Sequence, residues 1–293
     1  MQTLVTFIFK FLAALPLAWL HKLGNLLGSL GFRLLSKDRR RVFENMKLAG
    51  LNPTDEAVKK VFRETAKGGL ELPVAFFRRP EEIENLFVSV NGWEHVQTAL
   101  SAGEGLLFIT PHIGSYDLAG RYISQQLPFP LTAMYKPPKI KAFDAVMQAG
   151  RVRGKGKTAP TSIQGVKQII KALRGGEATI VLPDHVPSPE EGGDGVWMDF
   201  FGKPAYTMTL AGKLAQVKGV KALFFCGERL PDGKGFVLHI EPLRGELNGD
   251  KENDARVINE NTEYWIRRFP EQYLFMYNRY KHPEGAPLPP PEV

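Results

Sequence analysis

The sequence contains a single cysteine, Cys226, so no internal disulfide can form and nothing requires an oxidising compartment. It contains no Cys and His cluster with zinc-site spacing, no Walker-type phosphate loop and no Gly-x-Gly-x-x-Gly dinucleotide fingerprint. These absences exclude disulfide-stabilised domains, zinc modules and the common nucleotide-binding classes. They predict a protein that works without a metal ion or a cofactor.

The basic residues are concentrated near the N-terminus. The 293 residues are 43% apolar and 24% charged, as in an ordinary globular protein, and carry a net charge of +7. Residues 1–48 hold eight basic and two acidic side chains, a net +6, so the rest of the chain carries about +1. The positive charge is therefore a property of one segment and not of the whole protein.

That segment is also the most apolar one, because residues 4–20 are interrupted only by Thr6 and Lys10 and residues 23–35 continue with Leu, Gly and Phe. A cleaved signal peptide is disfavoured, since Lys10 breaks the apolar stretch and no small-residue cleavage site follows. A core helix needs no basic run at its end. A membrane anchor explains both features, either as a tilted single span or as a helix in the interface. The basic run at 37–41 then meets anionic lipids on the cytoplasmic side. We predict membrane lipids, and no nucleic acid, as partners.

Beyond this anchor, short apolar runs alternate with amphipathic stretches. Strands are expected at residues 87–90, 105–109, 131–135, 178–182, 220–227 and 235–240. The alternation predicts an α/β fold, a single layered domain with a mainly central β-sheet flanked by helices, plus an N-terminal membrane-anchor helix. We expect residues 1–36 to form the anchor and amphipathic segment, residues 37–281 the α/β domain, and residues 282–293 a flexible Pro-rich tail.

One apolar run, at residues 106–109, leads directly into Pro-His-Ile-Gly-Ser-Tyr-Asp at residues 111–117. The Gly and Ser predict a bend and a helix N-cap, so His112 lies in a strand-to-helix turn and can fold back towards Asp117. A carboxylate on one imidazole nitrogen fixes the tautomer and leaves the other nitrogen as a base. The simplest chemistry is direct: His112 takes a hydroxyl proton and that oxygen attacks an acyl carbonyl. The spacing alone also fits a turn histidine and an Asp favoured by the helix dipole.

Three further stretches carry candidate substrate-binding side chains. Arg151 and Arg153 stand in a Gly-rich basic loop that either holds phosphates or is simply solvated. Asp184 follows an apolar strand, where it binds acceptor hydroxyls, orients another site residue or caps a turn. Phe200 and Phe201 stand beside an acidic Pro- and Gly-rich loop, which fits either a lid over an acyl groove or a plain surface loop.

Taken together, these stretches resemble the late acyltransferases of lipid A biosynthesis, the lauroyl/myristoyl transferase family, within the wider lysophospholipid-acyltransferase-like group. The resemblance extends from about residue 4 to 285 and includes residues 40–46, 111–117, 151–153, 183–184, 200–205 and 270–273. The His-x4-Asp spacing is common to the wider group. The Phe-Phe-Gly and Pro-Glu-Gln-Tyr elements indicate the lipid A branch.

The resemblance implies transfer of a fatty acyl chain, lauroyl or similar, from acyl carrier protein to a hydroxyl of a lipid A precursor. It implies the cytoplasmic face of the bacterial inner membrane, with His112 as general base and Asp117 as its partner. A thioester donor is reactive enough for direct attack. The N–H groups of Gly114, Ser115 and Tyr116 are expected to bind the oxyanion. The two arginines of the basic loop are expected to hold the phosphates of the acceptor.

The sequence also departs from the family pattern. His185 and Val186 follow Asp184, where the family often has Gln-Asp, and residues 274–281 replace a commoner Trp/His/Arg-Arg pattern. These departures leave the acceptor subsite and the chain length open. Acyl transfer to another glycolipid or phospholipid and a non-catalytic membrane-bound scaffold remain alternatives. Another is a metal-dependent esterase that uses His112, Asp117, Asp184 and His185.

Overall fold

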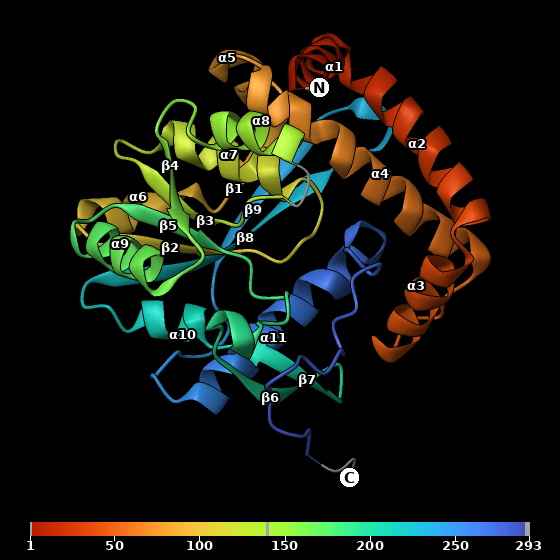
Figure 1. Cartoon of the computed structure of the whole chain (residues 1–293). Helices are drawn as coiled ribbons and strands as arrows, with labels where there is room; N and C mark the ends of the chain where they lie inside the picture. The colour runs from red at the N-terminus through yellow and green to blue at the C-terminus, as the bar shows by residue number, and fades with distance from the viewer. Residues whose placement is uncertain (1, 139–140, 291–293) are drawn as a thin grey trace.

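The computed structural model describes residues 2–138 and 141–290. Its centre is a seven-stranded sheet in the order β1-β9-β8-β2-β5-β3-β4 (Figure 1). The strands are β1 (Phe87–Asn91), β2 (Gly105–Ile109), β3 (Leu131–Tyr135), β4 (Gly156–Pro160), β5 (Ala178–Val181), β8 (Val220–Arg229) and β9 (Phe236–Pro242). Neighbouring strands are parallel except for β8 and β9, which pair antiparallel.

Helices cover the sheet on both faces and along one side (Figure 1). Those that follow the N-terminal region are α5 (Pro80–Glu84), α6 (Trp93–Ser101), α7 (Tyr116–Gln126), α8 (Lys141–Arg151), α9 (Ile163–Arg174), α10 (Leu210–Ala215) and α11 (Lys251–Arg268). The layered α/β fold with a central sheet flanked by helices, predicted from the alternating pattern, is confirmed.

Strand β2 lies inside the sheet, and it is buried on both faces because a core cluster packs on each of them. Leu106 and Phe108 belong to one core cluster, whereas Leu107 and Ile109 belong to the cluster on the other face. Successive side chains of a strand point to opposite faces, so a strand covered on both sides needs an uninterrupted apolar run. The end of this rigid strand is where the chain turns into α7.

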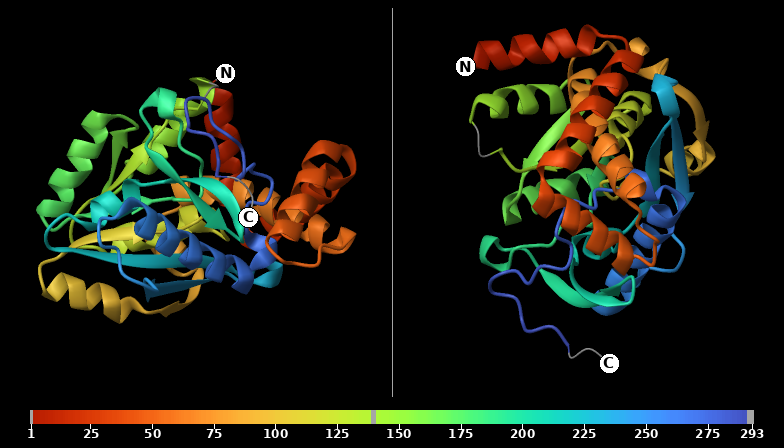
Figure 2. Two further views of the ribbon diagram at one scale, coloured as in Figure 1. Left: turned by 90° about the horizontal axis from the view of Figure 1, so that it is seen from below. Right: turned by 90° about the vertical axis from the view of Figure 1, so that its right-hand side faces the viewer.

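The N-terminal segment differs from the predicted single anchor helix. It forms α1 (Gln2–Ala14) and α2 (Leu17–Leu34), which are separated at Pro16. Proline cannot donate the backbone hydrogen bond that would continue α1. Within the described part of the chain no single helix is long and apolar enough to cross a membrane. Only residues 3–34 as a pair of helices bent by 117° meet that length and composition (Figure 2).

Helix α2 packs closely on α4 (Asp55–Phe77), and α3 (Ser36–Leu48) follows it. A side chain at Gly28 would collide with the backbone of Arg63, at 2.4 Å from its Cα, so glycine is required for this close approach. The other face of α2 is apolar but uncovered. Trp19 is 66% exposed, Leu26 66% and Leu34 69%.

A separate two-stranded hairpin, β6 (Gly195–Phe200) and β7 (Lys203–Met208), packs on α11. The described part of the predicted tail touches it: the indole N–H of Trp197 donates to Pro287 at 2.8 Å, and its ring stacks on His282. Residues 291–293 of that tail lie outside the described residues.

Candidate active site

The turn between β2 and α7 is fixed by its own backbone hydrogen bonds. The Gly114 N–H donates to the carbonyl of Gln272 at 3.0 Å, and the Ser115 N–H donates to the carbonyl of Gly227 at 2.8 Å. Gly114 has φ +59°, and a Cβ there would lie 2.0 Å from the Gly227 oxygen, so only glycine fits. Both N–H groups are therefore engaged with β8 and the 3₁₀ helix Pro270–Gln272, which corrects the prediction that Gly114 and Ser115 bind an oxyanion. For the Tyr116 N–H it stays a prediction.

His112 is held at two points by Asp184. The carboxylate lies 2.8 Å from imidazole Nδ1 and also accepts the His112 backbone N–H at 2.9 Å. Asp184 follows β5, which pairs with β2 in parallel, so the carboxyl ends of the two strands place the side chains together. Burial raises the pKa of Asp184, but the charge and hydrogen bonds of His112 outweigh it and hold the pKa at about 2. The carboxylate therefore stays ionised and keeps the proton of His112 on Nδ1.

Asp117 does not occupy the position predicted for it. Its carboxylate lies 3.5 Å from Arg151, while Asp184 takes the imidazole Nδ1. The difference arises because the turn is bonded to β8, whereas Asp184 reaches the ring from the neighbouring strand. Burial raises the pKa of Asp117, and the charges of Arg151 and His112 oppose this rise. Asp117 thus acts on His112 through its charge, and Asp184 orients the ring.

Two aromatic rings contact the His112 imidazole, and a third ring stacks on one of them. His185 stacks on it at a centroid distance of 4.0 Å and 13° between planes, and Tyr277 stacks on the far side of His185 at 4.3 Å. Tyr116 meets His112 edge-on at 5.0 Å. Burial, with the charge of His112, lowers the pKa of His185 to about 4, so His185 is neutral near pH 7. The stack restricts tilting of the imidazole away from Asp184.

The stacked geometry does not favour the metal-dependent esterase. Ring nitrogens direct their lone pairs within the ring plane, so the nearly parallel rings of His112 and His185 do not converge on one ion. Within residues 2–138 and 141–290, no three His, Cys, Asp or Glu side chains are grouped so that they could hold a metal.

Two cavities meet at His112. The larger has a volume of about 410 Å³ and lies between α7, α8 and strands β3 to β5. The smaller, of about 180 Å³, lies between α4 and the turn that joins β2 to α7. His112, Tyr116 and Asp117 line both. Since Nδ1 is bound to Asp184, Nε2 is the ring nitrogen left to accept a proton.

The two arginines predicted to bind phosphate have different surroundings. Arg151 lines the larger cavity together with Lys136 and Lys157. Arg153 lines neither of the two cavities, and one of its N–H groups donates to the Phe76 carbonyl at 2.9 Å. The structure thus brings Arg151, but not Arg153, to the turn between β2 and α7.

Phe200 and Phe201 lie at the turn of the β6–β7 hairpin and line neither cavity at His112. Phe200 is buried, and the Phe201 N–H donates to Glu263 of α11 at 2.6 Å. Their packing on α11 explains the double aromatic pair. The two rings therefore do not form the predicted acyl groove beside the turn between β2 and α7.

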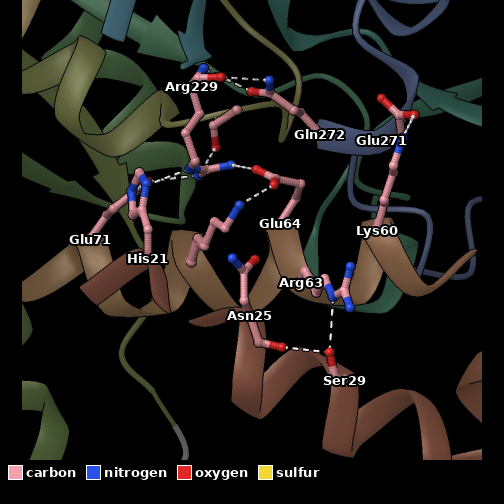
Figure 3. Close-up of polar contacts among 12 residues, drawn as sticks. His21, Asn25, Ser29, Lys60, Arg63, Glu64, Glu71, Arg229, Glu271 and Gln272 are labelled. Carbon is pink, nitrogen blue, oxygen red and sulfur yellow. Dashed lines mark hydrogen bonds and ion pairs between the residues drawn. The ribbon is translucent and has the colours of Figure 1, made fainter. Parts of the chain in front are cut away.

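Arg229 was missed by the sequence reasoning. Its guanidinium donates to Glu71 at 2.5 and 2.7 Å, to Glu64 at 2.8 Å and to the Gly114 carbonyl at 3.1 Å (Figure 3). Glu71 also binds His21 of α2 at 2.8 Å. Burial raises the pKa of Glu71, but Arg229 above all, with His21, brings it to about 2. The only sequence signal was two acidic residues seven apart on a largely buried helix.

A histidine fixed by a carboxylate at the end of a buried strand, with its free nitrogen between two cavities, suits an enzyme that activates a hydroxyl group. The sequence makes the class specific. Residues 1–282 match the bacterial lipid A biosynthesis acyltransferase family, and the chain belongs to it. The protein is therefore an acyltransferase, and the family resemblance noted from its motifs is confirmed.

Several relatives are similar over nearly the whole length. The chain is 28% identical to a lipid A biosynthesis lauroyltransferase of Escherichia coli (strain K12), with 93% of this chain and 89% of that protein covered. It is 26% identical to a lipid A biosynthesis acyltransferase of Haemophilus influenzae, covering 92% and 84%. It is also 26% identical to a lipid A biosynthesis palmitoleoyltransferase of E. coli, covering 91% and 86%. The named acyl groups differ among these relatives.

Proposed function

We propose that the protein transfers a fatty acyl chain from acyl carrier protein to a hydroxyl of a lipid A precursor, with His112 as the general base. The observation that carries this proposal is the position of His112: Asp184 binds Nδ1 at 2.8 Å, and the ring borders both cavities. Family membership supports the acceptor class, because relatives across the family are named for lipid A biosynthesis.

The reaction needs only one proton carrier. Nε2 of His112 takes the proton of the acceptor hydroxyl as its oxygen bonds to the thioester carbonyl carbon. The tetrahedral intermediate collapses, the carbon–sulfur bond breaks, and the carrier thiolate leaves. The thiolate then takes the proton back from His112, which returns to its starting state. Asp184 keeps the imidazole oriented and stabilises its positive charge between the two transfers.

We assign the phosphates of the acceptor lipid to Arg151. It lines the larger cavity with two lysines, and its guanidinium fork matches phosphate oxygens. Its contact with Asp117 at 3.5 Å positions the fork without using all its donors. Arg153 serves this site indirectly, because its hydrogen bond to Phe76 ties the basic loop to the end of α4.

The bent helix pair is the proposed membrane contact, on the cytoplasmic face of the bacterial inner membrane. The exposed apolar side chains of α1 include Leu4, Phe7 and Phe11, and those of α2 include Trp19 and Leu26. Exposed apolar side chains next to a basic run fit an interface rich in anionic lipids. We therefore propose that a pair of helices lies in the membrane interface, in place of a single helix that spans the membrane.

The membrane contact is tested by vesicle co-sedimentation of the purified full chain with anionic phospholipid vesicles. We expect Trp19→Glu combined with Leu26→Glu to release most of the protein, while Leu288→Glu, at an even more exposed apolar residue of the tail, leaves binding unchanged. Equal binding by all three proteins would contradict attachment through α2.

The reaction is tested with two donors and two acceptors. The purified protein is incubated with a lauroyl thioester of acyl carrier protein or with free laurate, and with either a 3-hydroxyacylated glucosamine disaccharide phosphate or a lysophospholipid. We expect one added acyl group only for the thioester with the glucosamine lipid. Acylation of the lysophospholipid alone would favour the other lipid acceptor class and refute this proposal.

A further inference from the structure

The smaller cavity has a floor without side chains. Gly68 and Gly69 both line it, and they lie in the interior of the 23-residue helix α4. A glycine in a helix interior costs about 0.5–1 kcal/mol relative to alanine. A Cβ at Gly69 would have no neighbouring atom within 4 Å, and one at Gly68 would meet Arg229 only at an ordinary 3.5 Å. Packing therefore does not require either glycine, and their effect is to leave room beside His112.

The charged wall of this cavity is already neutralised. Glu64 and Glu71 line it, and both are bound by Arg229, while Lys67 also binds Glu64 at 2.5 Å (Figure 3). Because each carboxylate already has a cationic partner, the wall has little net charge to attract either a phosphate or a cationic ligand. The wall therefore suits an uncharged segment of a substrate.

The larger cavity has the opposite character. Its lining includes three basic side chains, of which Lys136 and Lys157 are 63% and 55% exposed and Arg151 lies against Asp117. The cavity extends along α7 from Tyr116 to Ser124, past Arg121, over apolar residues of β3 and β5. The eight helical steps from Tyr116 to Ser124 correspond to about 12 Å at 1.5 Å per step. The apolar residues of β3 and β5 suit a fatty chain, and the two exposed lysines suit the phosphate of the thioester arm on which that chain arrives.

We propose that the smaller cavity receives the uncharged, hydroxyl-bearing acyl segment of the acceptor, while the larger cavity receives the acyl chain of the donor. This assignment rests on the proposed function. It places the hydroxyl on the α4 side of His112 and the thioester carbonyl on the α7 side. Because both cavities reach His112, the hydroxyl oxygen and the thioester carbonyl carbon come together in front of Nε2, which removes the proton as the oxygen attacks the carbon. Gly68 and Gly69 become specificity-determining residues, because a side chain at either position occupies space that the acceptor needs.

The test measures both Michaelis constants of the purified full-length protein. The donor is a lauroyl thioester of acyl carrier protein, and the acceptor is a 3-hydroxyacylated glucosamine disaccharide phosphate in mixed micelles. We expect Gly69→Leu to raise the KM for the acceptor by about tenfold or more, the scale of an overpacked site, and to leave the KM for the donor within about twofold.

The matched control narrows the other cavity. A Cβ at Gly120 meets the end of the Ile180 side chain at 3.1 Å, so Gly120→Ala intrudes on the larger cavity. We expect this variant to raise the KM for the donor and to spare that for the acceptor. Gly69→Ala keeps the test valid if leucine impairs folding: it raises the unfolding temperature through helix propensity and still raises the KM for the acceptor.

The outcomes separate the two proposals. No acylated product from the wild-type protein contradicts the proposed function. Product formation with an unchanged acceptor KM in both Gly69 variants, or with the donor KM raised instead, overturns only the assignment of the cavities.

Discussion

His21, His112 and His239 each bind a carboxylate at 2.8 Å, and of these three only His112 lines the two cavities described above. His21 pairs with Glu71 between α2 and α4, and His112 pairs with Asp184 at the carboxyl end of the sheet. Both carboxylates have a pKa of about 2. A histidine–carboxylate pair therefore does not by itself identify a base.

The surroundings of the second ring nitrogen make the difference. His21 is 1% exposed, and its Nδ1 is buried without a hydrogen-bond partner. The side chain of His112 is 12% exposed and lies against both cavities. Glu71 is in addition bound by Arg229, so the first pair belongs to a closed ionic network that joins three elements. We infer that the first pair stabilises the fold and the second performs chemistry.

The largest expected effect is on stability, in Glu71→Gln. Removing the charge leaves buried Arg229 and His21 without their main partner, so the free energy of unfolding should fall by about 3–5 kcal/mol, as when a buried ion pair is broken. Denaturant unfolding measures it. Glu260→Gln is the control, because Glu260 pairs with Arg256 on the exposed face of α11 and should cost at most about 0.5 kcal/mol. Equal losses in the two variants would refute a special role for the network.

Acid should lower the free energy of unfolding by protonating Glu71. The pKa of Glu71 is about 2 in the folded protein against an ordinary 4.5, so its contribution is complete above pH 4.5 and is lost as the pH falls towards 2. Unfolding free energies measured across this range should decline with falling pH. The decline should be shallower in Glu71→Gln, which has no carboxylate to protonate there. A parallel decline in both proteins would assign the acid sensitivity to other groups.

The next effect is on catalysis. Asp184→Asn should lower kcat by about 10²-fold, the scale expected when a general base is lost, because the amide no longer enforces the productive tautomer. Asp117→Asn should lower kcat by less than about tenfold, since Asp117 acts on His112 only through its charge. Steady-state rates of the two variants at saturating substrate concentrations show which of the two carboxylates orients His112. A larger loss in Asp117→Asn would return the orienting role to the residue expected from the sequence.

The sequence was informative where contacts are local. The apolar run of β2, the proline and the Gly-Ser bend predicted a histidine in a strand-to-helix turn, and the structure has that turn. The partner of His112 was not predictable from spacing, because Asp184 is 72 residues away and reaches it only through the pairing of β2 with β5. Strand order is a property of the whole sheet and not of any local pattern.

The same reasoning explains the other differences. Pro16 was visible in the sequence, but whether it kinks a helix or separates two depends on how α2 packs against α4. The apolar pair at 200–201 predicted an aromatic wall, and the structure has one, but the hairpin places it on α11 and away from His112. Arg229 belongs to no local motif, since its partners come from α4 and from the turn between β2 and α7.

The smallest effect concerns the ring stack. His185→Ala should lower kcat up to about tenfold, in line with the 0.5–1.5 kcal/mol of an aromatic pair, because His112 loses the face that restrains it. His185→Phe should retain most of the activity, since it keeps the stacking surface. The comparison uses kcat at matched folded fraction. Loss in the Phe variant together with rescue by His185→Gln would show that His185 acts through a hydrogen bond and not through its face.

The central claim is that His112 transfers the proton between the two substrates. The most direct measurement is the mass of the acceptor lipid after incubation with a lauroyl thioester of acyl carrier protein, for the wild-type protein and for His112→Ala at equal folded concentrations. The account predicts the mass gain of one acyl group with the wild type and about 10²-fold less product, or lower still, with His112→Ala, at an unchanged unfolding midpoint. Equal amounts of acylated product from the two proteins would contradict it.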